Sequence, residues 1–189
     1  MDALNRGWLA ATLGTVCVLA AACRSDELLV RNPTAGLNGG FEITEAGYPV
    51  NWAFFPNPEA DSTLRVVLDS SQVVEGSHSL KIVVRPSERL PALRSRQVAV
   101  QPGKHYRFRI SFRNEGCSLE VNRIVLDASG MTVRRRDRII DTSVSSPDWE
   151  TFEEILSVAH DEAQVLLVII IDRSGAIWLD DVQLEEVGG

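Results

Sequence analysis

The sequence predicts an all-β fold, a two-sheet β-sandwich that forms a single domain after an N-terminal signal peptide. Short segments rich in β-branched and aromatic residues recur at close spacing, and turn formers such as Gln101-Pro102-Gly103 separate them. The chain after the leader contains no convincing helical stretch. About nine short strands without helices are typical of a β-sandwich.

The chain begins with an export signal. Arg6 precedes an apolar stretch from Trp8 to Ala22, which is too short to span a bilayer as a helix but suits the apolar core of a signal peptide. We therefore divide the chain into a signal peptide (1–22), a cysteine with a short tether (23–27) and a β-sandwich domain (28–187).

The end of the leader, Leu19-Ala20-Ala21-Ala22-Cys23, resembles a bacterial lipobox. In that motif the cysteine is lipidated and becomes the first residue of the mature protein, so the resemblance implies attachment of Cys23 to a membrane. Ala20 stands where the motif has its leucine. Ala20 and Ala22 also fit ordinary signal cleavage, which leaves secretion as an alternative, and a retained leader is a third.

Each expected strand is a mainly apolar run bounded by Gly, Pro, Asn, Asp or Ser. In chain order the strands are Leu64 to Leu68, Ser79 to Val84, Val98 to Val100, Tyr106 to Phe112, Leu119 to Leu126, Met131 to Ile140, Phe152 to Val158, Val165 to Ile171 and Ala176 to Leu184. Ser145-Ser146-Pro147 is interpreted as a break between two of them.

Two of these segments differ in their pattern. The segment 106–113 alternates, with apolar Tyr106, Phe108, Ile110 and Phe112 on one side and Arg107, Arg109, Ser111 and Arg113 on the other. The segment 165–171 is apolar on both sides. Its second side, Leu166, Val168 and Ile170, therefore needs cover from a loop, or it forms the apolar floor of a ligand site.

Charge and cysteine content exclude several classes of protein. The net charge of -7 argues against non-specific binding to nucleic acid. After the leader, Cys117 is the only cysteine besides Cys23, so the domain has no internal disulfide. We expect Cys117 to be a buried apolar side chain and the fold to depend on core burial.

The sequence also argues against an enzyme. The histidines His78, His105 and His160 are scattered, and neither a paired-histidine metal motif nor a Gly-x-Ser-x-Gly elbow is present. Neighbouring carboxylates such as Asp180 and Asp181 point to opposite faces of a regular strand, so they cannot flank one glycosidic bond together.

Six motifs in this order resemble the jelly-roll carbohydrate-binding modules of families 4, 9 and 22. They are Asn38-Gly39-Gly40-Phe41-Glu42, the segments 47–52, 75–80, 100–106 and 149–152, and the ending from Ile177 to Glu185, which contains Asp180-Asp181-Val182. The resemblance covers residues 28–187. It implies a jelly roll that binds a polysaccharide and performs no catalysis.

The resemblance also implies one structural calcium ion where the first and last strands meet. Glu42 matches a carboxylate of that site, Asp180 or Asp181 matches its second acid, and the loop from Gly76 to Ser79 matches the source of carbonyl ligands. We favour Asp180, because it shares the parity of Trp178 and Val182, which are expected to be buried. The alternative is that these carboxylates cap backbone amides or pair with arginine.

Two groups of residues are candidates for ligand contacts. Tyr48, Phe54 and Phe55 lie in the loop around Trp52 and offer a stacking surface, unless the two phenylalanines plug the end of the sandwich. Trp52, Trp149 and Trp178 match framework positions of the family and are expected in the core. The second candidate is the arginine side of the strand at 106–113. Arg107, Arg109 and Arg113 suit an anionic polysaccharide, and a solvated, salt-bridged strand surface is the alternative.

The sequence therefore favours a non-catalytic carbohydrate-binding lipoprotein of the bacterial cell envelope. Arg24 follows the cysteine in place of an aspartate that retains such proteins at the inner membrane, which favours the outer membrane. The rival is a structural or assembly lipoprotein that uses the same domain to bind a protein partner and no sugar.

Overall fold

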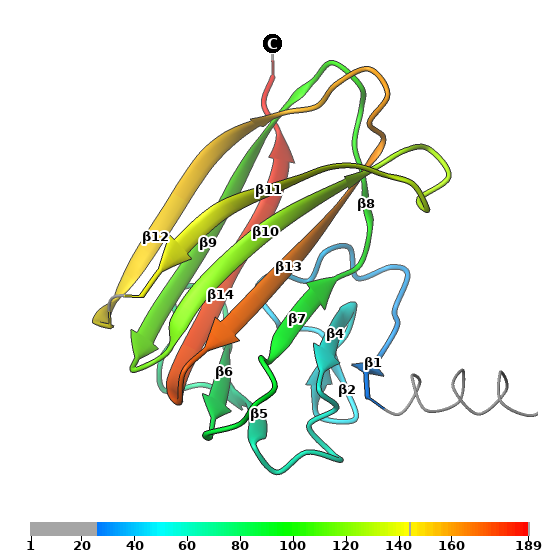
Figure 1. Ribbon diagram of the computed structural model, residues 1–189. Helices are drawn as coiled ribbons and strands as arrows, with labels where there is room; N and C mark the ends of the chain where they lie inside the picture. The colour runs from blue at the N-terminus through cyan, green and yellow to red at the C-terminus, as the bar shows by residue number, and fades with distance from the viewer. Residues whose placement is uncertain (1–25, 144, 189) are drawn as a thin grey trace, which may run out of the picture.

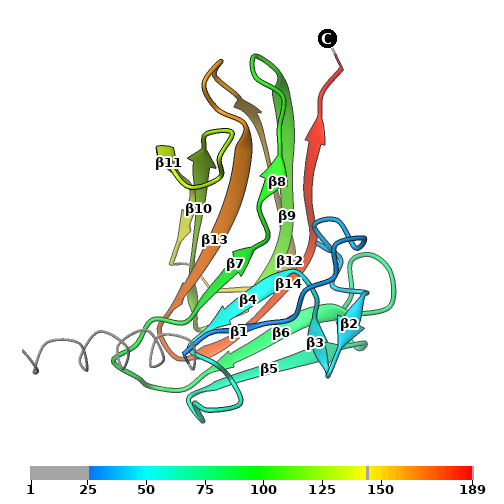
Figure 2. The same ribbon diagram turned by 90° about the vertical axis from the view of Figure 1, so that its right-hand side faces the viewer.

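The computed structural model describes residues 26–143 and 145–188, so the predicted signal peptide and Cys23 lie outside the described residues. The described residues form two packed β-sheets and a small hairpin, as the two views in Figures 1 and 2 show. No helix among them has the length and apolar character needed to cross a bilayer.

The larger sheet, which we call sheet 1, has the strand order β1-β4-β7-β13-β10-β11, with β8 also paired to β13. Its strands are β1 (Leu28–Leu29), β4 (Trp52–Phe55), β7 (Ala92–Ser95), β8 (Val98–Ala99), β10 (Ser118–Leu126), β11 (Val133–Thr142) and β13 (Gln164–Asp172). All its named pairs are antiparallel.

Sheet 2 is the five-stranded layer with the order β12-β9-β14-β6-β5. Its strands are β5 (Leu64–Asp69), β6 (Ser79–Val84), β9 (His105–Glu115), β12 (Ser146–Ser157) and β14 (Gly175–Glu186). A separate hairpin pairs β2 (Thr44–Glu45) with β3 (Tyr48–Pro49).

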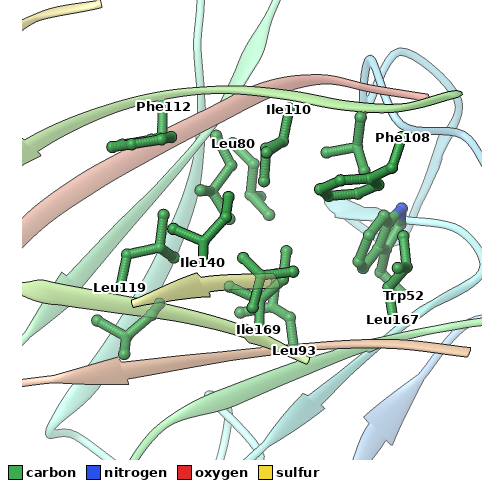
Figure 3. Close-up of a cluster of buried hydrophobic side chains, with 14 of the residues drawn as sticks. Trp52, Leu80, Leu93, Phe108, Ile110, Phe112, Leu119, Ile140, Leu167 and Ile169 are labelled. Carbon is green, nitrogen blue, oxygen red and sulfur yellow. The ribbon is translucent and has the colours of Figure 1, made fainter. Parts of the chain in front are cut away.

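The core lies between the two sheets. In Figure 3, Phe108, Ile110 and Phe112 of β9 face Leu119, Leu167 and other apolar side chains of sheet 1. Phe108 and Ile110 are fully buried. The alternation predicted for β9 is therefore confirmed, and its arginines lie on the outer face of sheet 2.

Cys117 belongs to this core, as its sequence context predicted. Its side chain is 1% exposed, and burial raises the pKa of the thiol to about 11. The thiol is therefore protonated at neutral pH and is not a reactive nucleophile.

Several strand predictions need correction. The segment around Trp52, predicted as a loop, is β4 in sheet 1, and β7 was missed. Both strands have only four residues, which is too short for a clear period. Pro147, predicted as a break, lies inside β12, where the register shifts between Ser146 and Glu150. Since β12 is an edge strand, the missing N–H of a proline is tolerated there.

The prediction about the parity of β14 was wrong because the strand contains a bulge. The register shifts between Asp180 and Gln183, and Asp181 has a φ of 53°. Trp178 and Asp180 lie opposite Arg113 and Ser111, on the outer face of sheet 2, whereas Val182 joins the core. Asp181 contacts Arg109 on that same outer face, so the two carboxylates do not point to opposite faces.

Candidate functional site

The predicted arginine group lies together on sheet 2, but each member has a partner in the protein. Arg107 pairs with Glu153 at 3.2 Å, and the Arg109 Nε lies 2.9 Å from Asp181 Oδ2. Arg113 donates to Glu115 and to Gln72. This is the salt-bridged surface weighed as the alternative, and a ligand contact at these arginines stays a prediction.

Trp178 lies beneath this surface and is 4% exposed. The Arg113 guanidinium and the Lys81 ammonium lie 4.9 Å and 4.3 Å from its ring centroid. Its indole Nε1 donates to Asp69 Oδ2 at 2.8 Å. Hydrogen bonds from the Ser71 hydroxyl and from this indole hold the pKa of Asp69 at about 2. Because the two cations cover its ring, Trp178 offers no stacking platform.

The predicted calcium residues do meet at one place, where they fix the loop between β5 and β6. Asp180 Oδ2 accepts hydrogen bonds from the amides of Val74 and Glu75 at 2.8 and 3.2 Å, and its Oδ1 accepts the Asp181 amide at 2.8 Å. Burial nevertheless raises the pKa of Asp180, and the neighbouring Asp181 charge adds to that rise.

Glu42 holds the other end of the same loop. Its Oε1 accepts from the amides of Ser77 and His78 at 2.6 and 2.8 Å, and its Oε2 lies 3.3 Å from His78 Nδ1. Burial raises the pKa of Glu42, but the hydrogen bonds from His78 and Ser77 outweigh it and lower the pKa overall. Gly76 fits here because a Cβ would lie 2.4 Å from Glu42 Oε1, and its φ is +75°.

This arrangement does not fit a calcium ion. The carboxylate oxygens accept N–H groups, whose positive ends would repel a cation approaching from that side. The Ser79 hydroxyl donates to the Gln72 carbonyl at 2.5 Å and so helps to fix the same loop. No group of three His, Cys, Asp or Glu suited to a metal occurs among the described residues. The amide-capping alternative describes Glu42 and Asp180 as they lie.

The predicted aromatic group is divided by the fold. Phe54 is fully buried and packs on Tyr48 at a ring-centroid distance of 5.9 Å, so it belongs to the core and cannot contact a ligand. Phe55 is 42% exposed. It lies on sheet 1, whereas Arg107 and Arg109 lie on the outer face of sheet 2, so the two predicted groups do not form one site.

The outer face of sheet 1 carries a mixed apolar and polar surface. The sequence predicted only one part of it, the second apolar side of the segment 165–171. Residues directly opposite in an antiparallel pair share a face. One row across the sheet is Leu29, Ala53, Arg94, Val168, Asn122 and Arg138. A parallel row is Phe55, Ala92, Ile170, Glu120 and Asp141.

The second side of β13 lies on this face. Leu166, Val168 and Ile170 are neither fully buried nor fully exposed, so no loop covers them completely, and the apolar floor of a ligand site stays a prediction. At the far end of the rows the polar groups are engaged with each other. Asn122 donates to Glu120 at 2.7 Å, and Arg138 pairs with Glu120 and Asp141.

A pocket of about 410 Å³ opens on this face. Its apolar lining includes Leu29, Ala53 and Leu166, and three arginines, Arg31, Arg94 and Arg96, also line it. The remaining lining residues are Pro33, Asn51, Ser95 and Gln97. Sequence reasoning missed this pocket because its residues come from β1, β4, β7, β13 and the loops beside them.

The sequence matches no protein-family model, and no curated protein matches it. Solved structures do match. One contains the family 22 module and glycoside hydrolase family 10 module of xylanase 10B from Clostridium thermocellum, complexed with xylohexaose. It has 13% identity and a TM-score of 0.53 over 72% of this chain and 26% of that one.

Two further structures show the range of the similarity. The enzymatically active domain of tailspike protein 4 of bacteriophage CBA120 has 13% identity and a TM-score of 0.59, over 84% of this chain and 22% of that one. The family 22 xylan-binding domain of Xyn10C from Paenibacillus barcinonensis has 16% identity and a TM-score of 0.52, over 80% of this chain and 93% of that one.

These similarities concern the fold. The chain spans about a quarter of the xylanase and tailspike chains but nearly the full length of the isolated family 22 domain. The predicted all-β sandwich of the jelly-roll type is confirmed, and so is its likeness to structures of carbohydrate-binding modules.

Proposed function

We propose that this protein binds a polysaccharide on the outer face of sheet 1, without catalysing its cleavage. The observation that carries the proposal is the combination on one face of an exposed aromatic side chain, an apolar floor and polar groups. Phe55 offers a ring for stacking, while Val168 and Ile170 form the floor beside it. Arg94 on the same face provides donors for sugar oxygens.

The nature of the structural neighbours supports this proposal. Several are described as xylan-binding domains or carbohydrate-binding modules, and the similarity covers 93% to 99% of their length. Because a fold hosts unrelated functions, this support is by analogy, and the surface of sheet 1 is the physical argument.

The cellular context belongs to the same proposal. A lipid on Cys23 would keep the protein at the bacterial cell envelope, on the outer membrane, and ordinary signal cleavage would instead release it. In either case the domain meets polysaccharide outside the cytoplasm.

Affinity electrophoresis in gels containing single polysaccharides, xylan among them, tests the proposed site. We expect a polysaccharide to retard the protein and Phe55→Ala to reduce the retardation at least severalfold, since stacking is lost. Ile155→Ala is the matched control, because Ile155 is 51% exposed on β12 of sheet 2.

If Phe55→Ala leaves the retardation unchanged and Ile155→Ala removes it, the binding site lies on sheet 2 and not on sheet 1. If no polysaccharide retards the protein, the rival assembly function takes the place of this proposal.

A further inference from the structure

The pocket on sheet 1 concentrates positive charge in a chain whose net charge is -7. Arg31, Arg94 and Arg96 line it, and no aspartate or glutamate belongs to the lining. We propose that this pocket binds the anionic group of an acidic polysaccharide, a carboxylate or a sulfate. This inference rests on the proposed function and names the chemical class of its ligand.

The three guanidinium groups retain donors for a ligand. Arg31 is exposed and has no hydrogen bond or ion pair within residues 26–143 and 145–188. Arg94 pairs with Glu27 through Nη2. Arg96 donates from Nη1 to the Pro33 carbonyl at 3.1 Å and from Nε to the Gln97 carbonyl at 3.4 Å. Each guanidinium has five N–H donors, so most remain available, and their fork geometry matches carboxylate and sulfate oxygens.

The other polar side chains of the pocket are already engaged in holding its walls. The Asn51 amide accepts from the Asn32 amide and donates to the carbonyls of Asn32 and Gly36. The Ser95 hydroxyl donates to the Arg96 carbonyl and accepts the Leu167 amide. The groups left for a ligand are therefore mainly cationic.

The lining also lacks an aromatic residue. A neutral sugar in this pocket would find no ring to stack on and no carboxylate to accept its hydroxyl protons. An anionic group instead gains charge-assisted hydrogen bonds, which are about twice as strong as neutral ones.

The arginines of sheet 2 provide a contrast. Arg107 and Arg109 each face a carboxylate, Glu153 and Asp181, so their charge is compensated inside the protein. In the pocket only Arg94 has such a partner, the half-exposed Glu27 near the start of β1. The pocket is therefore a better site for the anionic ligand that the sequence predicted at Arg107, Arg109 and Arg113.

The test is affinity electrophoresis of the protein with two anionic polymers and their neutral counterparts. Polygalacturonate is compared with its carboxyl-reduced form, and dextran sulfate with dextran. We expect the anionic member of at least one pair to retard the protein more, and the difference to shrink as salt rises. Which pair responds distinguishes a carboxylate ligand from a sulfate ligand.

Charge-neutralising variants locate the binding. Arg31→Gln and Arg94→Gln should each weaken retention by about tenfold, as expected for the loss of a charge-assisted contact. Glu27→Gln should strengthen retention, because it frees Arg94. Arg107→Gln makes the same charge change on the opposite sheet and should have little effect.

Three results would overturn the inference. If Arg107→Gln weakens retention as much as Arg31→Gln, the effect is general charge or the sheet 2 surface. If the neutral polymers or xylan retain the protein as strongly as the anionic polymers do, and only Phe55→Ala removes retention, the site binds a neutral glycan. The proposed function is then kept and the inference is rejected. If no polymer is retained, the proposed function fails together with the inference.

Discussion

At the scale of single residues, the pKa of a carboxylate in this domain depends on its burial and on the N–H and O–H groups that donate to it. Asp69 is partly buried and Asp180 is fully buried, and the pKa of Asp69 is lowered whereas that of Asp180 is raised. The difference arises because two side-chain donors, Ser71 and Trp178, offset the burial of Asp69, whereas burial prevails at Asp180.

This difference predicts the acid response. The folded pKa of Asp69 is about 2 against an ordinary value of 3.8. Its contribution to stability is therefore fully present above about pH 4 and is lost as the pH falls through 2. We expect Asp69→Asn to be less stable at pH 7 and to lose less stability between pH 4 and 2, as measured by melting temperature against pH.

The raised pKa of Asp180 has the opposite effect, because its contribution grows as the pH falls, but it is common to both proteins and cancels in their difference. Asp148→Asn changes an exposed aspartate and serves as the control. A pH profile of Asp69→Asn parallel to that of the unchanged protein would contradict the prediction.

At the scale of elements, the loop between β5 and β6 is held by a segment near the start of the domain and by the last strand, β14. Glu42 holds the Ser77 and His78 amides, and Asp180 of β14 holds the amides of Val74 and Glu75. Close by, the Val182 amide donates to the Gly39 carbonyl at 3.0 Å. These direct hydrogen bonds join the segment around Gly39 and Glu42 to β14.

We therefore expect the melting temperature to be unchanged by a calcium chelator or by added calcium. An ion that binds only the folded protein would raise the melting temperature in a concentration-dependent way. Asp180→Ala should lower the melting temperature equally with and without chelator, because it leaves the Val74 and Glu75 amides unpaired. A chelator effect that Asp180→Ala abolishes would restore the calcium site.

Elements also show what the sequence could and could not predict. The strand β9 was predictable because its side chains alternate over many residues, which leaves one consistent face for the core. The faces of β14 were not, because a bulge at Asp181 interrupts the alternation without a Gly or Pro to mark it. Phe54 is buried and its neighbour Phe55 is exposed. The pairing of β4 with β7 determines which of the two faces the core.

At the scale of the whole molecule, the candidate site depends on tertiary assembly. Its pocket combines Arg31 near β1 with Leu166 of β13, residues far apart in the sequence. No local motif marks them, because each is an ordinary arginine or leucine until the strands pair. The segment 165–171 was the one usable signal, since a strand that is apolar on both sides implies an unusual second face.

A lipid on Cys23 would determine where the whole molecule is held. Between Cys23 and Leu29, which lines the pocket, the chain can extend by at most about 22 Å, since a residue spans no more than about 3.6 Å. A lipidated Cys23 would therefore keep the pocket close to the membrane surface. We expect mass spectrometry of the protein from its native host, or from another bacterium, to find an acylated N-terminal Cys23. Cys23→Ala should move the protein to the soluble fraction, whereas Cys17→Ala, within the leader, should not. An unmodified N-terminus at Cys23, or a leader still attached, would show that the protein is secreted or retained by other means.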